Sequence, residues 1–168
     1  MSSGPGAVFF PPVFRERVRT GIIAGAIAAA ATLGVLVGFG RARRAGARPV
    51  NAIAHILLGA RAFDVLDLDA VVTSTAVALH IASLLVWGIL FAMVAGRSRG
   101  WRLATAAVAF VLGAALIDFA VLPDRLRPGF EHVLSRPELV LLYAVLAGAL
   151  AVAVALRRPA ASTPRSAP

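Results

Sequence analysis

Cysteine is absent from the 168 residues of this chain. Its absence excludes disulfide bonds, thiolate metal sites and cysteine nucleophiles. Lysine is absent as well, so all 17 basic residues are arginines, which outnumber the eight acidic residues and give a net charge of +9. The sequence also lacks the H-E-x-x-H pattern of zinc proteases and the G-x-S-x-G pattern of serine hydrolases. We therefore expect no metal, no other cofactor and no enzyme of these familiar classes.

Charge is nearly missing from four long apolar stretches, which cover about residues 21–40, 70–96, 103–122 and 139–156. A bilayer core ~30 Å thick needs about 20 apolar residues of helix to cross it. Inside the stretches, only His80 and Asp118 are charged or titrate near neutral pH. The sequence therefore predicts an all-α membrane protein with four transmembrane helices in one bundle.

The first stretch follows Arg15, Arg17 and Arg19 and could be mistaken for a signal peptide. The apolar core of a signal peptide is usually about 7–15 residues long, which is shorter than this stretch. We expect it to remain as the first helix of a transmembrane domain over residues 12–158. The flanking segments 1–11 and 159–168 are rich in small residues and proline and are predicted to be disordered.

A shorter helix is predicted over about residues 51–59, with Asn51 as its N-cap and Gly59 at its end. It is too short to cross a bilayer, which favours an interfacial or re-entrant position.

Further signals mark the ends of the long helices. Asp67 or Asp69 is expected to cap the second, and Pro123 to end the third. Ser135 and Glu138 have the spacing of a capping box before the fourth.

Small residues recur at intervals of four in the first helix: Gly21, Gly25 and Ala29, then Gly34 and Gly38. Such spacing lets membrane helices approach closely. An alanine-rich composition would also scatter small residues without any packing role, so both interpretations stay open.

The arginines gather at the ends of the apolar stretches, where they can contact lipid headgroups. This arrangement favours the bilayer as the partner of the positive charge and argues against nucleic acid. With four spans, both termini and the connector 97–102 share one side, the terminal face, with nine arginines; the connectors 41–69 and 123–138 form the connector face, with eight. Arginine triplets beside the span ends, and the longer connectors opposite, favour cytoplasmic termini. The arginine-, alanine- and glycine-rich composition is typical of a bacterium, so we expect the inner (plasma) membrane.

Polar side chains of the membrane region gather toward the connector face. The candidate site residues are Thr73, His80 and Ser83 on one stripe of the second helix, Asp118 on the third, and Asn51 and His55 on the short helix. We predict that they form a polar patch that opens to the connector face and is floored by His80.

An ionised aspartate inside a bilayer costs roughly 2.5–3.5 kcal/mol at mid-membrane, so Asp118 is expected to have a partner. The candidates are His80, Asn51, Arg125 and Arg61. One interpretation is a hydrogen bond or ion pair that fixes helix packing; the other is a carboxylate that binds a ligand or exchanges protons with His80. Haem ligation is disfavoured because no second histidine lies deep. Arg125 and Arg127 are either contacts for an anionic headgroup or ordinary loop anchors.

Two segments, N-A-x-x-H at residues 51–55 and D-x-x-x-x-P-x-R-L-x-P-G-F-E at residues 118–131, resemble short signatures of uncharacterised small four-span proteins of bacterial inner membranes. The resemblance implies no activity. The first hypothesis is a non-enzymatic bundle or accessory subunit, with a second copy or another membrane protein as partner. The alternative is a small transporter or proton-coupled carrier that uses His80 and Asp118. A cofactor-binding or lipid-acting membrane enzyme comes third.

Overall fold

The structure, a computed structural model, describes residues 11–157. The segments predicted to be disordered, 1–11 and 159–168, therefore lie outside the described residues except for Pro11. Four long helices dominate it: α1 (Pro12–Ala42), α4 (Ala70–Ala95), α5 (Gly100–Leu116) with the π-helical turn η3 (Ile117–Val121), and α6 (Arg136–Leu156). All four are long and apolar enough to cross a membrane. The described part of the chain has no strand. The predicted all-α class with four long helices is therefore confirmed.

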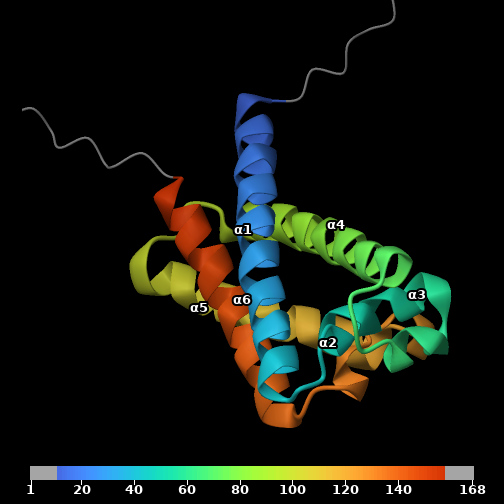
Figure 1. Ribbon diagram of the computed structural model, residues 1–168. Helices are drawn as coiled ribbons and strands as arrows, with labels where there is room; N and C mark the ends of the chain where they lie inside the picture. The colour runs from blue at the N-terminus through green and yellow to red at the C-terminus, as the bar shows by residue number, and fades with distance from the viewer. Residues whose placement is uncertain (1–10, 158–168) are drawn as a thin grey trace, which may run out of the picture.

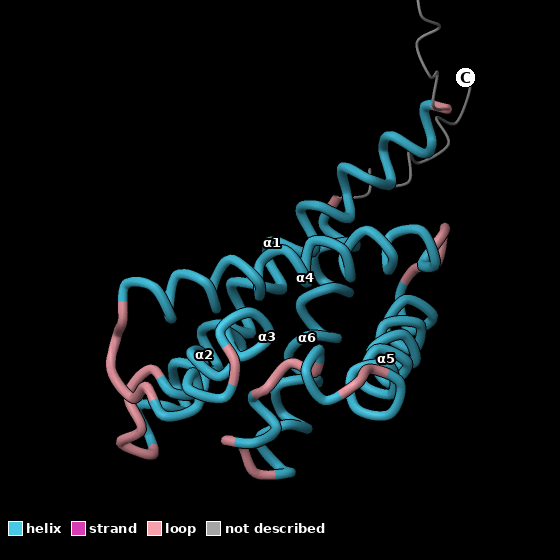
Figure 2. Tube along the Cα trace, turned by 90° about the vertical axis from the view of Figure 1, so that its right-hand side faces the viewer, coloured by secondary structure: helices cyan, strands magenta, loops and turns pink. Residues whose placement is uncertain are grey.

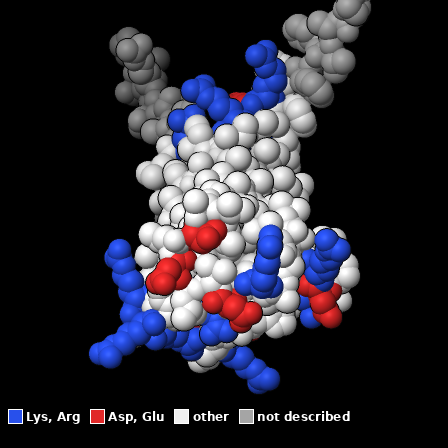
Figure 3. Space-filling model, turned by 45° about the vertical axis from the view of Figure 1, so that its right-hand side comes forward, with Lys and Arg blue, Asp and Glu red and all other residues white. Residues whose placement is uncertain are grey.

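The charges sit at the two ends of the molecule. The α1 helix has 31 residues, or about 46 Å at 1.5 Å per residue, and so exceeds a ~30 Å bilayer core. Its first turns, which begin at Pro12 and carry Arg15, Arg17 and Arg19, project beyond the other helices in Figure 1. Figure 3 shows an uncharged belt between a basic end near the tails and an opposite end with both signs of charge.

The helix ends follow the capping signals of the sequence. Asp69 is the N-cap of α4, because its side chain accepts hydrogen bonds from the backbone of Val71 and Val72. Ser135 and Glu138 form the capping box of α6. The third long helix ends before Pro123, as expected.

The short helical segment between α1 and α4 is longer than predicted and starts earlier. It comprises α2 (Arg48–Asn51), η1 (Ala52–Ala54) and α3 (His55–Leu58), and η2 (Ala60–Asp64) follows after Gly59. The prediction that Asn51 caps this helix is wrong, since Ala47 is the N-cap and Asn51 lies inside the helical run. Residues 49–55 are buried because the segment packs against α1 and α4 (Figure 2).

Helix packing leaves a gap between α4 and α5. The α1 helix packs against α4 and α6, and α5 packs against α6, whereas α4 and α5 touch little. Gly21 and Gly25 of α1 meet Gly88 of α4 so closely that a Cβ on any of them would lie within 3.0 Å of the other backbone. Gly34 and Gly38 face open space. The small-residue spacing therefore serves packing only in the first half of α1.

Candidate functional site

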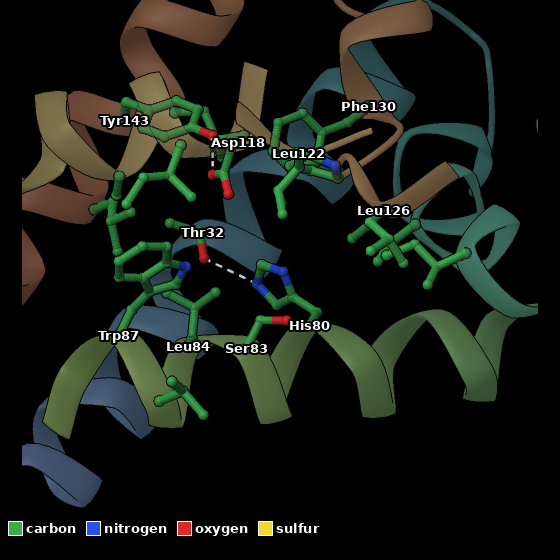
Figure 4. A pocket seen from close by; sticks show the side chains of 18 residues that line it. Thr32, His80, Ser83, Leu84, Trp87, Asp118, Leu122, Leu126, Phe130 and Tyr143 are labelled. Carbon is green, nitrogen blue, oxygen red and sulfur yellow. Dashed lines mark hydrogen bonds between the residues drawn. The ribbon is translucent and has the colours of Figure 1, made fainter. Parts of the chain in front are cut away.

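A cavity of about 370 Å³ lies in the gap between α4, the α5–η3 helix and α6 (Figure 4). The connector turns η4 (Asp124–Leu126) and η5 (Phe130–His132) close it on the connector side. Its walls are mostly apolar, and the polar groups that line it are Thr32, His80, Ser83, Trp87, Asp118 and Tyr143.

The cavity is open along one side. Val86 on α4, Ile117 on η3 and Leu126 on η4 line it and are 57%, 40% and 48% exposed. Ser83 is exposed at the same rim. These exposed side chains mark where the cavity opens to the outside of the apolar belt.

His80 is buried against α1. Its Nε2 lies 2.9 Å from Oγ1 of Thr32 and 3.3 Å from the carbonyl oxygen of Ala29. The Thr32 hydroxyl donates to the carbonyl of Ala28 at 2.7 Å, which leaves its lone pairs to accept. We therefore assign the imidazole proton to Nε2, where it meets two acceptors. His80 is therefore held against α1 by a side-chain hydroxyl and a backbone carbonyl.

Asp118 lies in the π-helical turn that ends the third long helix. The hydroxyl of Tyr143 on α6 donates to its Oδ2 at 2.6 Å. The ring of Tyr143 lies edge-on to Phe119 and Phe130, with centroids 5.7 and 6.4 Å apart. The prediction that His80, Asn51, Arg125 or Arg61 would be the partner of Asp118 is therefore wrong.

Asp118 and His80 point into the same cavity from opposite walls (Figure 4). They share no hydrogen bond. Within residues 11–157, neither Nδ1 of His80 nor Oδ1 of Asp118 has a hydrogen-bond partner. With Nε2 protonated, Nδ1 is an acceptor, and a carboxylate oxygen is an acceptor too. The arrangement offers two acceptors to a donor that enters the cavity.

Asn51 and Thr73 belong to a separate network, contrary to the prediction of one patch. Asn51 is 0% exposed, and its amide donates to the carbonyls of Val65 and Asp67 at 2.9 and 3.0 Å. Its carbonyl accepts from the Thr73 hydroxyl at 2.7 Å. This network ties the connector before α4 to the helices, and it does not line the cavity.

His55 does not line the cavity either, which corrects its predicted place in the patch. Its Nδ1 lies 2.9 Å from the carbonyl of Ala52, and its ring stacks on Phe63 with centroids 4.9 Å apart. Gly129, at φ 87°, passes so close that a Cβ there would lie within 3.0 Å of the His55 ring. His55 therefore joins the two long connectors.

The two arginines predicted to contact headgroups differ. Arg127 pairs with Asp124 at 2.8 Å and donates to the carbonyl of Leu122 at 3.3 Å, so it stabilises its own turn. Arg125 is exposed. Of these two arginines, only Arg125 remains available to contact a headgroup.

Three polar residues of this region are not among those predicted from the sequence: Thr32, Tyr143 and Glu131. Tyr143 is the only tyrosine of the chain, and Thr32 is the only polar residue of the apolar stretch 21–40. Either feature could have pointed to a polar role in the bundle. Both carboxylate oxygens of Glu131 are buried without a hydrogen bond, and His132 lies 3.7 Å away. No sequence pattern marks that burial.

In the described residues, no three His, Asp or Glu side chains gather as a metal site would require. Comparison of the chain with protein-family models, curated proteins and solved structures found no match. The four long apolar helices are compatible with a multi-pass integral membrane protein.

Proposed function

We propose that this chain is a non-enzymatic binding protein of the bacterial inner membrane, an accessory subunit whose bundle holds an amphipathic molecule. The ligand has an apolar body and a hydroxyl or amine head. The observation that carries the proposal is the cavity, which combines apolar walls with two acceptors, Nδ1 of His80 and Oδ1 of Asp118.

Size and access support this ligand class. Small-molecule sites usually measure about 300–1,000 Å³ and are mostly apolar with a few polar groups, and this cavity of about 370 Å³ fits both criteria. Ser83 at its rim lies about 20 Å along α4 from Ala70, near the middle of the helix. At that depth the surroundings are acyl chains, so the ligand enters from the bilayer.

The two acceptor atoms, Nδ1 of His80 and Oδ1 of Asp118, favour a ligand whose head group donates hydrogen bonds. A hydroxyl or ammonium can donate to both walls, whereas an ether or ester oxygen would face two acceptors and lose its own hydration without replacement. The Thr32 and Tyr143 hydroxyls already donate to Ala28 and Asp118 and so hold both walls in place.

The expected orientation, with cytoplasmic termini, is part of the proposal. The basic end of the molecule (Figure 3) carries arginines close to the ends of α1, α4 and α6, as the positive-inside rule expects of a cytoplasmic side.

A proton-coupled carrier is the second candidate, because His80 and Asp118 line one cavity. It predicts pH-dependent flux in proteoliposomes that Asp118→Asn and His80→Ala abolish. A binding subunit predicts no flux above that of protein-free vesicles, with binding intact in the wild type.

Binding can be followed through Trp87, which lines the cavity. In a Trp101→Phe background it is the only tryptophan. We expect a chain-brominated dodecanol in nanodiscs to quench Trp87 saturably. Ala114→Phe, which fills the cavity, should remove the saturable part. Ala109→Phe, on the exposed side of the same helix, is the matched control and should keep it. Equal quenching in both variants would refute an internal site.

A further inference from the structure

A second hollow, of about 250 Å³, lies on the terminal face where α1 begins and α4 and α6 end. Four arginines line it: Arg17 from α1, Arg97 and Arg99 from the turn after α4, and Arg157 after α6. Glu16 is the only acidic residue among its lining residues. We propose that this hollow, the arginine pocket, binds the phosphate of an anionic phospholipid headgroup.

The positive charge of the arginine pocket is not neutralised by ion pairs with neighbouring carboxylates. Within residues 11–157 none of the four arginines forms an ion pair, and Arg17 donates to the backbone carbonyl of Met93 at 3.2 Å. By contrast, Arg43 and Arg127 at the connector face pair with Glu138 and Asp124 at 2.7 and 2.8 Å. Other arginines of the connector face also lack an ion pair in the described residues, but the arginine pocket places four such guanidinium groups around one hollow.

Helix dipoles do not account for the cluster. Arginines often bind the carbonyl groups at helix C-termini, and the C-termini of α4 and α6 meet the N-termini of α1 and α5 here, since Arg99 is the N-cap of α5. Two C-termini contribute roughly −0.5 each and two N-termini roughly +0.5 each, so the dipoles cancel. Four arginines and one glutamate contribute +3. A charge of about +3 thus remains for an external anion.

The position of the arginine pocket favours a lipid over a soluble anion. Arg157 directly follows the last residue of α6, and Arg97 lies two residues after the end of α4, so both lie where headgroups are expected. On the side of the apolar belt, Ala92 of α4 and Val154 of α6 line the same hollow and join it to that belt. A phospholipid fits both the charged and the apolar part of the hollow. The planar guanidinium groups can bind the phosphate oxygens in pairs, and the apolar side chains can contact the glycerol and acyl chains.

The test is a titration of the full chain in detergent with phosphatidylglycerol or with phosphatidylcholine of the same chains, read by native mass spectrometry. We expect one phosphatidylglycerol to bind more tightly than phosphatidylcholine. The triple variant Arg97→Gln/Arg99→Gln/Arg157→Gln should bind it at least about tenfold more weakly. The control Arg44→Gln/Arg61→Gln/Arg125→Gln removes the same charge from exposed arginines of the connector face and should stay within about twofold of the wild type.

Several results would overturn the assignment. Equal weakening in both triple variants would show diffuse attraction, and equal affinity for phosphatidylcholine would show apolar binding alone. Displacement of phosphatidylglycerol by inorganic phosphate at equal concentration would assign the arginine pocket to a soluble anion. If the triple variant fails to fold, Arg97→Gln and Arg99→Gln singly must each weaken binding, because both side chains are exposed in a turn.

The inference rests on the membrane placement in the proposed function but not on the cavity. Ala114→Phe should leave phosphatidylglycerol binding unchanged, and the arginine triple variant should leave dodecanol quenching unchanged. The two measurements therefore test the cavity and the arginine pocket separately, so one proposal can fail while the other holds.

Discussion

Gly25 of α1 and Gly88 of α4 place two helix backbones in direct contact. A Cβ on Gly88 would lie within 3.0 Å of the amide nitrogen and Cα of Gly25. This approach holds α4 against α1, while α5 is held by α6. The cavity lies between α4 and α5 because each of them packs on a different helix and no comparably close contact joins them.

Gly88→Ala should therefore destabilise the bundle. The added methyl group has no space, and overpacking of this kind typically costs about 1–3 kcal/mol. Thermal unfolding in detergent checks the prediction. Gly34→Ala, in a helix of the same bundle but facing open space, is the control and should leave the melting temperature unchanged or raise it slightly. A neutral Gly88→Ala would mean that the two helices do not meet as described.

The Thr32–His80 hydrogen bond should appear as a coupling energy. In a double-mutant cycle of Thr32→Val and His80→Phe we expect about 0.6 kcal/mol of coupling, the average for interhelical hydrogen bonds in membranes, and at most about 1.7 kcal/mol. Thr32→Val with Asn51→Ala is the control cycle and should be additive, because the two side chains belong to separate networks. Coupling near zero in the first cycle would contradict the pairing.

Tyr143→Phe should destabilise through Asp118. The variant keeps the ring beside Phe119 and Phe130 but removes the donor to the carboxylate. We expect a loss of about 1–2 kcal/mol. Adding Asp118→Leu should recover most of that loss, since replacing both partners by apolar groups is nearly neutral. Two additive losses instead would show that the hydroxyl and the carboxylate act independently.

Asn51→Ala should loosen the connector before α4. The amide holds the carbonyls of Val65 and Asp67, so hydrogen exchange over residues 60–69 should accelerate while α6 stays protected. Ser74→Ala serves as control, because the Ser74 hydroxyl bonds only to its own helix. Uniform acceleration over the whole chain would indicate global destabilisation rather than release of the connector.

Orientation can be tested directly, because the chain has no native cysteine. With cytoplasmic termini, Arg125→Cys should react with an impermeant maleimide on intact cells, and Arg102→Cys only after permeabilisation. The reverse pattern would place the termini outside.

The architecture was predictable because bilayer thickness sets the helix length and because caps such as Asp69 act locally. The depth of His80 and Asp118 followed from their positions along the helices. Their partners did not follow, since Thr32 meets His80 only through the glycine contact of α1 with α4, and Tyr143 reaches Asp118 only through the packing of α5 on α6. The sequence predicts a charged or amide partner for Asp118, whereas the bundle supplies a neutral hydroxyl. It also predicts a local cap at Asn51, but the side chain of Asn51 donates hydrogen bonds to the connector that follows.

On the proposed function, the cavity selects an amphiphile whose head group donates hydrogen bonds. The most direct test compares chain-brominated dodecanol with its methyl ether in nanodiscs, through quenching of Trp87 in the Trp101→Phe protein. We expect saturable quenching by the alcohol and at least about tenfold weaker binding of the ether. This preference should be lost in the double variant His80→Phe/Asp118→Leu. Equal affinities for the alcohol and the ether in the Trp101→Phe protein would contradict it.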